Sequence, residues 1–99
     1  MARSKIRTRK YDTARYLKTE RDVVGYLEAA FEDGHPLVIA AALGDVARAR
    51  GMSAIARKAG LSRESLYKAL APSGNPQLST FLSVLHALGL TLRVVPERA

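Results

Sequence analysis

The chain has 99 residues, a formal net charge of +7, 47% hydrophobic residues and no cysteine. This length suits one compact domain with a single core, and the lack of cysteine excludes disulfides and thiolate metal sites. No segment approaches the roughly 18 apolar residues of a membrane span, and no apolar run follows the basic N-terminus, so we expect a cytoplasmic protein.

Charge is distributed unevenly along the chain. Residues 1–18 carry basic side chains against Asp12 alone, a balance of +6, and we interpret them as a basic N-terminal extension of a domain at residues 19–99. Residues 20–45 have a balance of −5, and residues 48–68 return to +5. This segregation predicts that one side of the domain meets a polyanion and another side is kept away from it. For the extension, a solvated charge run is the alternative.

Hydrophobic spacing predicts five helices followed by a short terminal strand. The first helix is expected at about residues 20–33, where Thr19 and Asp22 resemble a capping box and Gly34 supplies a stop. Pro36 fits the first turn of a second helix, which is apolar on most faces and ends at Gly51. We expect this second helix to form the centre of the core.

Residues 53–70 carry the size restrictions expected where two short helices meet steeply across a tight turn. Ala56 is small where the second helix would cross, and Gly60 permits the left-handed backbone at the end of the first helix. Leu66 returns an apolar anchor to the core, and Ser62 can cap the second helix. The other expected buried positions are Ile55, Ala59, Leu61, Ala69 and Leu70. Together these features predict a helix-turn-helix motif.

The buried positions leave Arg63, Glu64, Tyr67 and Lys68 on the outer face of the second of these helices. A recognition helix presents such a face to the major groove of DNA. Arg63 and Lys68 suit guanine O6 and N7, and Glu64 could accept a hydrogen bond from cytosine N4. An ordinary solvated helix face is the alternative.

Other polar residues around the turn are suited to the DNA backbone. We expect Arg57 and Lys58 to contact phosphates, which adds affinity and salt dependence without sequence information. Ser62 and Ser65 could reach phosphates or base edges.

The last predicted helix follows a loop at residues 71–76. Pro76 fits its first turn, Asn75 is a candidate cap and His86 is expected to be exposed. Its expected apolar stripe is Leu78, Phe81, Leu82, Leu85 and Leu88. Residues 90–95 are rich in β-branched and apolar side chains and predict a short strand, which needs a partner such as a second copy across a dimer axis.

Two resemblances to known families rest on these residues. Residues 53–88 resemble the helix-turn-helix of the Cro and phage-repressor superfamily, which implies an all-α, five-helix, lambda-repressor-like DNA-binding fold. A narrower resemblance covers Tyr11 to Pro96, where several strings are similar to those of addiction-module antidote proteins, bacterial antitoxins with a helix-turn-helix domain. The strings are YLKTE (16–20), ALGDVARARGM (42–52), GLSRESLYKAL (60–70), GNP (74–76) and ALGL (87–90).

The resemblance to antidote proteins implies a partner and a regulatory role. The partner would be a small toxin of the RelE and ParE type, encoded beside this chain, and the chain would repress the shared operator as a homodimer. The superfamily's binding pattern implies DNA-contacting positions at Ser62, Arg63, Glu64, Tyr67 and Lys68, with phosphate contacts from Ser53, Arg57 and Asn75. The basic extension could fold onto a partner, act as a DNA arm or stay unfolded.

Other classes of protein fit less well. The only histidines are His35 and His86, and no phosphate-binding glycine fingerprint or serine elbow occurs, so we expect no enzyme activity, cofactor or metal. An RNA-binding module is disfavoured because aromatic residues do not cluster with the arginines. A stand-alone helix-turn-helix repressor without a toxin uses the same chemistry as an antitoxin, and the sequence does not separate the two.

Overall fold

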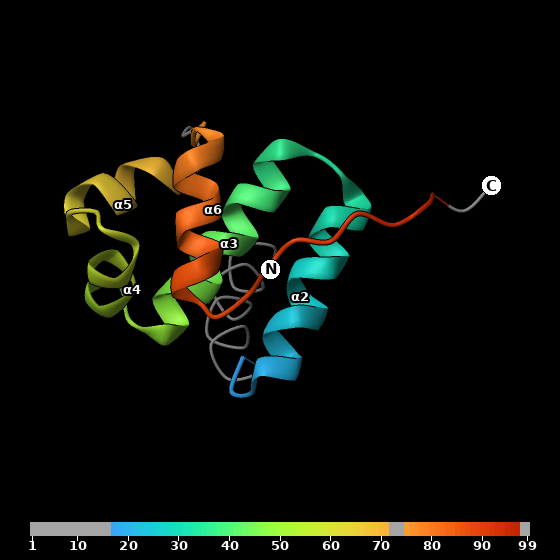
Figure 1. The fold of residues 1–99 in the computed structure, drawn as a ribbon, viewed down its shortest axis with the longest axis horizontal. Coiled ribbons are helices and arrows are strands. Elements are labelled where there is room, and N and C mark those ends of the chain that lie inside the picture. Colours follow the sequence, from blue (N-terminus) through green and yellow to red (C-terminus); the bar gives the residue numbers. More distant parts are fainter. Residues whose placement is uncertain (1–16, 72–74, 98–99) are drawn as a thin grey trace, which may run out of the picture.

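The computed structural model describes residues 17–71 and 75–97, and within them the chain folds into five helices (Figure 1). These are α2 (Glu20–Asp33), α3 (Pro36–Arg50), α4 (Met52–Ala59), α5 (Arg63–Ala69) and α6 (Leu78–Ala87). The all-α prediction is confirmed for this part of the chain. The expected basic extension, apart from its last two residues, and positions 72–74 of the loop before α6 lie outside the described residues.

Helix α2 begins and ends where its capping residues predict. Thr19 Oγ1 accepts a hydrogen bond from the Asp22 amide at 3.1 Å, and the Asp22 carboxylate accepts one from the Thr19 amide at 3.1 Å. This capping box satisfies two backbone donors that a helix start leaves free. At the other end Gly34 adopts a left-handed φ of 81° and donates to the Ala30 carbonyl.

Helix α3 crosses the middle of the molecule and is held to α2 by a polar link. Pro36 lies in its first turn, and His35 Nδ1 caps it by accepting from the Leu37 amide at 3.1 Å. Tyr26 on α2 donates its hydroxyl to Asp45 at 2.6 Å, and Arg48 pairs with the same carboxylate at 2.9 Å. The Tyr26–Asp45 hydrogen bond therefore joins α2 to α3 in addition to their apolar contacts, and Arg48 orients the accepting carboxylate from within α3.

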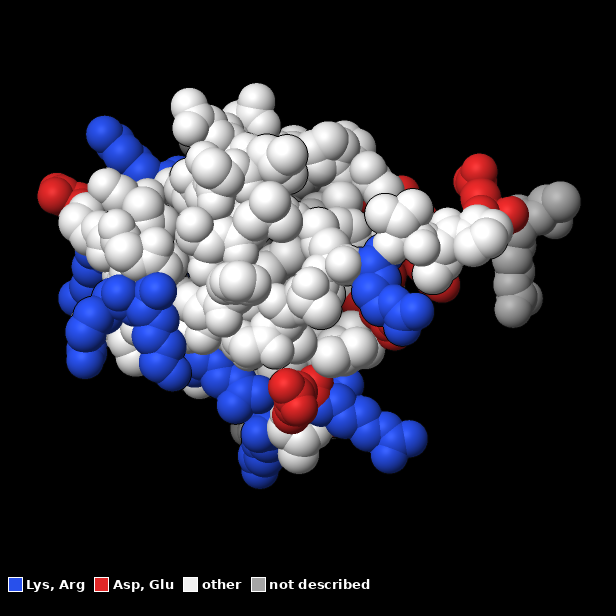
Figure 2. All heavy atoms as spheres, viewed as in Figure 1, with Lys and Arg blue, Asp and Glu red and all other residues white. Residues whose placement is uncertain are grey.

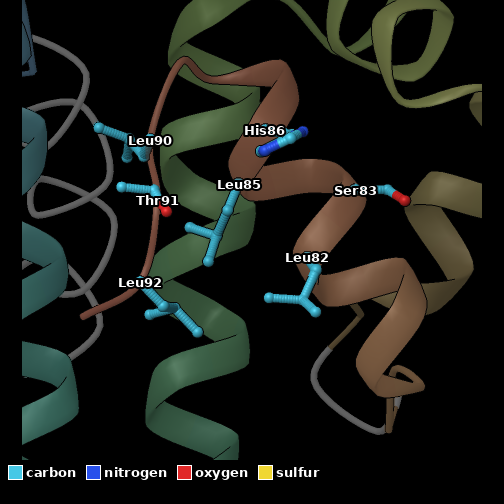
Figure 3. Close-up of a pocket in the computed structure, with 7 residues that line it drawn as sticks. All are labelled: Leu82, Ser83, Leu85, His86, Leu90, Thr91 and Leu92. Carbon is cyan, nitrogen blue, oxygen red and sulfur yellow. The ribbon is translucent and has the colours of Figure 1, made fainter. Parts of the chain in front are cut away.

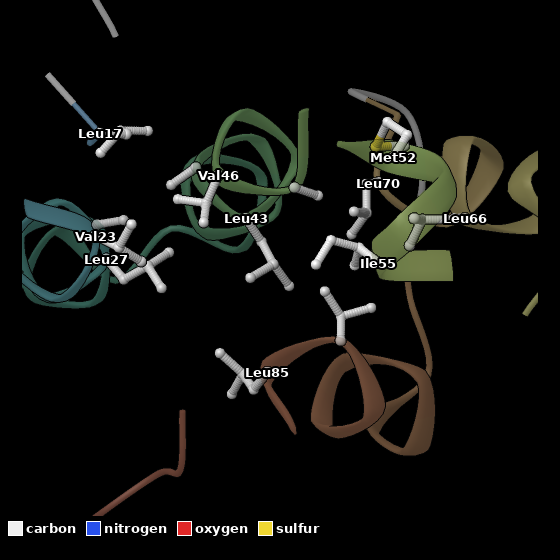
Figure 4. Close-up of a cluster of buried hydrophobic side chains, with 14 of the residues drawn as sticks. Leu17, Val23, Leu27, Leu43, Val46, Met52, Ile55, Leu66, Leu70 and Leu85 are labelled. Atoms are coloured by element: carbon white, nitrogen blue, oxygen red, sulfur yellow. The ribbon is translucent and has the colours of Figure 1, made fainter. Parts of the chain in front are cut away.

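The hydrophobic core surrounds α3, as predicted. Leu43 and Val46 are fully buried and lie between Val23 and Leu27 of α2 on one side and the α4 and α5 residues on the other (Figure 4). Leu17, which precedes α2, is 4% exposed and belongs to the same cluster. Each fully buried Leu or Val contributes about 1.5–3 kcal/mol relative to exposure, so this cluster supplies the main stabilisation.

Small residues allow the helices to approach closely at two places. Gly44 of α3 is buried, and a Cβ atom there would lie 3.3 Å from the Leu70 carbonyl oxygen at the end of α5. Ala56 of α4 is 2% exposed, in agreement with its predicted place at the crossing. The α4–α5 unit therefore packs onto the body through backbone approach as well as through large side chains.

Helix α6 differs from its prediction at both its start and its buried face. Its N-cap is Gln77, without a side-chain hydrogen bond, so the expected start at Pro76 with Asn75 as cap is wrong. Val84, absent from the predicted stripe, is fully buried beside Leu85, whereas Leu78 is 70% exposed. The stripe predicted from helical spacing left out Val84, and the buried face that packs against α4 is rotated toward that residue. His86 is exposed, as expected.

The predicted strand at residues 90–95 is wrong within the described chain. After Gly89, with a φ of 79°, residues 90–97 form an extended arm, of which Leu90 still packs against the core and the end projects beyond α2 (Figure 1). The Leu90 amide donates to the Leu85 carbonyl at 2.9 Å, and in the described region no further backbone hydrogen bond joins the arm to another segment. A strand needs a neighbouring strand to fill its hydrogen-bond ladder, and the described part of this chain offers none.

Candidate nucleic-acid interface

Helices α4 and α5 are joined by a short turn of defined geometry, and we call these two helices the α4–α5 pair. Gly60 ends α4 with a left-handed φ of 75°, a conformation that costs a glycine little. The Leu61 amide then donates to the Ala56 carbonyl at 2.8 Å, which closes the helix end. Ser62 is the N-cap of α5. The turn predicted from Gly60 and Ser62 is confirmed.

Helix α5 is anchored on one face and capped at its start. Leu66 is fully buried and Leu70 is 2% exposed, so both predicted anchors are confirmed. Ser62 Oγ accepts from the Ser65 amide at 3.0 Å and lies 2.8 Å from Ser65 Oγ. The hydroxyls of Ser62 and Ser65 therefore stabilise the first turn of α5. The fixed first turn and the buried leucines together determine which face of α5 is exposed.

The outward face of α5 holds the predicted base-reading residues together. Arg63, Glu64, Tyr67 and Lys68 are all exposed. The Arg63 guanidinium lies over the Tyr67 ring, 5.3 Å from its centroid, and donates to the Tyr67 hydroxyl at 3.3 Å. A guanidinium stacked on a ring loses less rotamer freedom when it binds a further group. The tyrosine therefore prearranges the arginine on this face.

The predicted phosphate-contacting residues of α4 are also exposed. Ser53 lies at the start of α4, and Arg57 and Lys58 lie in its last turn. Lys and Arg side chains gather over the side of the molecule formed by the α4–α5 pair and along the neighbouring lower edge (Figure 2). Glu64 is the one acidic residue in the two helices. This side consequently presents net positive charge to a polyanion.

One basic residue near this surface was not among the predicted site residues. Arg50 ends α3 just before α4 and is exposed, and it has no ion pair within the described residues. Its neighbour Arg48 is paired with Asp45 and is less free to contact another charge. Arg50 was counted in the positive charge of residues 48–68, so the sequence held a clue to its role. Only the fold shows that Arg48 forms an ion pair whereas Arg50 forms none among the described residues.

Asn75, a candidate phosphate contact, is not grouped with the α4–α5 pair. It is exposed and lines a hollow with residues of α2, α3 and α6, among them Phe31, Leu37 and Phe81. Among residues 17–71 and 75–97, no set of three His, Asp or Glu side chains is arranged to hold a metal ion. None of the described helices is long and apolar enough to cross a membrane. The observed surface is therefore one of cationic and hydrogen-bonding side chains.

Most of the chain is similar to known proteins. A family model described as a probable addiction module antidote protein matches residues 7–96. An uncharacterized protein of Haemophilus influenzae (strain ATCC 51907 / DSM 11121 / KW20 / Rd) is 46% identical over 88 residues, which cover 89% of this chain and 91% of the relative. No solved structure matches the chain.

Proposed function

We propose that this chain, which belongs to the family of probable addiction module antidote proteins, neutralises a RelE- or ParE-type toxin and represses the operon that the two proteins share. The family carries an antitoxin role, and the toxin type and the repression are our inference. Both activities would act in the cytoplasm, where the operator and the toxin's targets are found.

The single observation that carries the repressor part is the outward face of the α4–α5 pair. Two buried leucines fix α5 to the core, and Arg63 is held by Tyr67 at the exposed start of the helix. We propose that α4 and α5 act as a helix-turn-helix and that α5 enters the major groove. Helix α5 is exposed, has one acidic side chain and is surrounded by basic side chains, and these properties suit a helix that lies between the phosphates of the major groove.

Individual roles follow from the chemistry of the exposed groups. Arg63 and Lys68 would donate to guanine O6 and N7, and Glu64 would accept from cytosine N4. Arg57 and Lys58 would contact phosphates, which position the protein without reading sequence. Ser62 and Ser65 are weaker candidates for DNA contacts, because their hydroxyls already bond to each other. Asn75 is weaker because it lines a hollow between α2, α3 and α6. Ser53 remains a candidate phosphate contact at the start of α4.

A homodimer is the second part of the proposal. The arm exposes Leu92 at 44%, Val95 at 70% and Val94 completely, which is unusual for apolar side chains. Beside it, Leu82, Leu85 and Leu92 surround a hollow of about 280 Å³ between α6 and the arm (Figure 3). A second copy would cover these apolar groups, and two copies would match a palindromic operator.

A growth assay tests the antitoxin assignment. The open reading frame beside this gene is induced alone and then together with this chain, and a reporter for the shared promoter is measured in the same cells. We expect growth arrest that the chain relieves, and a promoter that the chain represses. A harmless neighbour, or toxicity that the chain leaves unchanged, would contradict the antitoxin role; repression without neutralisation would favour a stand-alone repressor.

A further inference from the structure

An apolar hollow of about 560 Å³ lies where the end of α2, the start of α3 and the start of α6 meet. Its walls include Phe31, Ile39 and Phe81, and the two phenylalanine rings meet edge to face with centroids 5.9 Å apart. Leu37 stands at its rim with 51% of its surface exposed. The hollow is a preformed apolar site that the described part of the chain does not fill.

The part of α2 that contributes Phe31 to the hollow carries unpaired negative charge along the helix, although no carboxylate of the described residues lines the hollow itself. Glu32 follows Phe31 directly, and Glu28 lies one turn before it on the same side of the helix. Both carboxylates are exposed, and within the described residues neither accepts a hydrogen bond or forms an ion pair. Asp33, which accepts from the His35 amide at 3.3 Å, adds a third negative charge. This combination of an apolar hollow and free carboxylates selects against a nucleic acid.

The hollow lies away from the outward face of α5. Helix α2 and the α4–α5 pair lie on opposite sides of α3 and α6 (Figure 1), so the acidic residues of α2 and the basic residues of the α4–α5 pair belong to different parts of the molecule. Much of the face between them is uncharged (Figure 2). A ligand at the hollow would therefore cover no residue of α5, and Asn75 is the one candidate phosphate contact that such a ligand would cover.

We propose that this hollow, with Glu28 and Glu32, is the docking site for the toxin partner, an inference that rests on the proposed antitoxin function. The occupant is a segment of the toxin that inserts an apolar side chain against Phe31 and Leu37 and places Lys or Arg beside the two glutamates. Apolar insertion supplies affinity, and the charges set the orientation and speed of docking. Toxin and operator then bind one antidote molecule together.

Isothermal titration calorimetry with the purified product of the neighbouring gene tests this site on the full chain. Leu37→Lys removes an exposed apolar contact and adds a repelling charge, and Glu32→Lys reverses one carboxylate without touching the core. We expect each to weaken toxin binding about tenfold or more while operator binding stays within about twofold of the unchanged chain. Glu20→Lys, an identical charge change at the exposed start of α2, at the opposite end of that helix from the hollow, is the control and should bind both partners normally.

The possible failures are distinguishable. If the unchanged chain does not bind the gene product, the proposed function fails and this inference fails with it. If the chain binds but both variants bind equally well, the antitoxin function stands and the docking site is wrong. If light scattering shows that the variants alter the oligomeric state and leave toxin affinity unchanged, a second copy covers the hollow and the proposal is overturned.

Discussion

Helices α2 and α5 are built alike on the inside and differ on the outside. Each buries a few apolar side chains against the α3 core, Val23 and Leu27 in one case and Leu66 in the other. Outside, α2 carries carboxylates that lack ion pairs among the described residues, whereas α5 carries an arginine held by a tyrosine. The inward faces therefore account for the fold, and the outward faces account for the difference between an acidic helix and a helix that carries the exposed Arg63 and Lys68.

The largest expected effect comes from removing the inner anchor of α5. Leu66→Asp would place an unpaired carboxylate in the core and lower the free energy of unfolding by at least about 4 kcal/mol, enough to abolish cooperative melting. Circular dichroism during heating measures this. The matched control is Leu78→Asp, at a position 70% exposed, which should melt like the unchanged protein. A normal transition for Leu66→Asp would mean that α5 is not anchored through this residue.

The next prediction separates base reading from phosphate contact on the basic side. Arg63→Ala should weaken operator binding by about 1–3 kcal/mol and relax preference at one base pair. Arg57→Ala should weaken operator and random DNA alike and reduce the slope of log affinity against log salt by about one. Fluorescence anisotropy over a salt series distinguishes the two. Equal losses on both DNAs for Arg63→Ala would refute its base-reading role.

A smaller effect is expected where α2 is tied to α3. Tyr26→Phe removes the hydroxyl that donates to Asp45 at 2.6 Å, and should lower the free energy of unfolding by about 1–2 kcal/mol. Urea denaturation gives this value. Tyr67→Phe removes an exposed hydroxyl from α5 and should leave stability unchanged, which makes it the control. Equal stability of both variants would show that the polar link between α2 and α3 contributes little.

The smallest expected effect concerns pH and the capping box of α2. Hydrogen bonds from Thr19 hold the pKa of Asp22 below its ordinary value. The bonds favour the charged carboxylate, so their contribution is present above about pH 4 and is lost as the pH falls through the lowered pKa. Asp22→Asn should flatten the acid side of the stability curve measured by chemical denaturation. An unchanged pH dependence would remove this role from Asp22.

Local signals explain why α2, α3 and the turn were predictable. Capping at Thr19 and the glycines at positions 34, 51 and 60 act through hydrogen bonds or backbone angles within a few residues, so the sequence alone specifies them. The anchor Leu66 is equally predictable, because it precedes the apolar Leu70 by four residues and helical spacing puts both on one face. Family membership was also visible in strings of residues along the chain.

Non-local contacts explain the errors and the omissions. Val84 and Leu82 are both apolar, and only packing against α4 made the first buried and left the second 42% exposed. Residues 90–95 have the composition of a strand, but composition supplies no hydrogen-bonding neighbour. Asn75 lies near the α5 segment in sequence and still lines a hollow of α2 and α3, because the position of α6 determines where the loop ends.

The sequence by itself determined that these helices exist, both caps of α2, the turn between α4 and α5 and the segregation of charge, since each depends on neighbours along the chain. Only the tertiary structure decided that an apolar hollow lies between α2, α3 and α6 while the α4–α5 pair forms another side of the molecule. The physical reason is that a helix fixes which residues share its face, whereas the direction of that face depends on how the buried side chains of all the helices fit together.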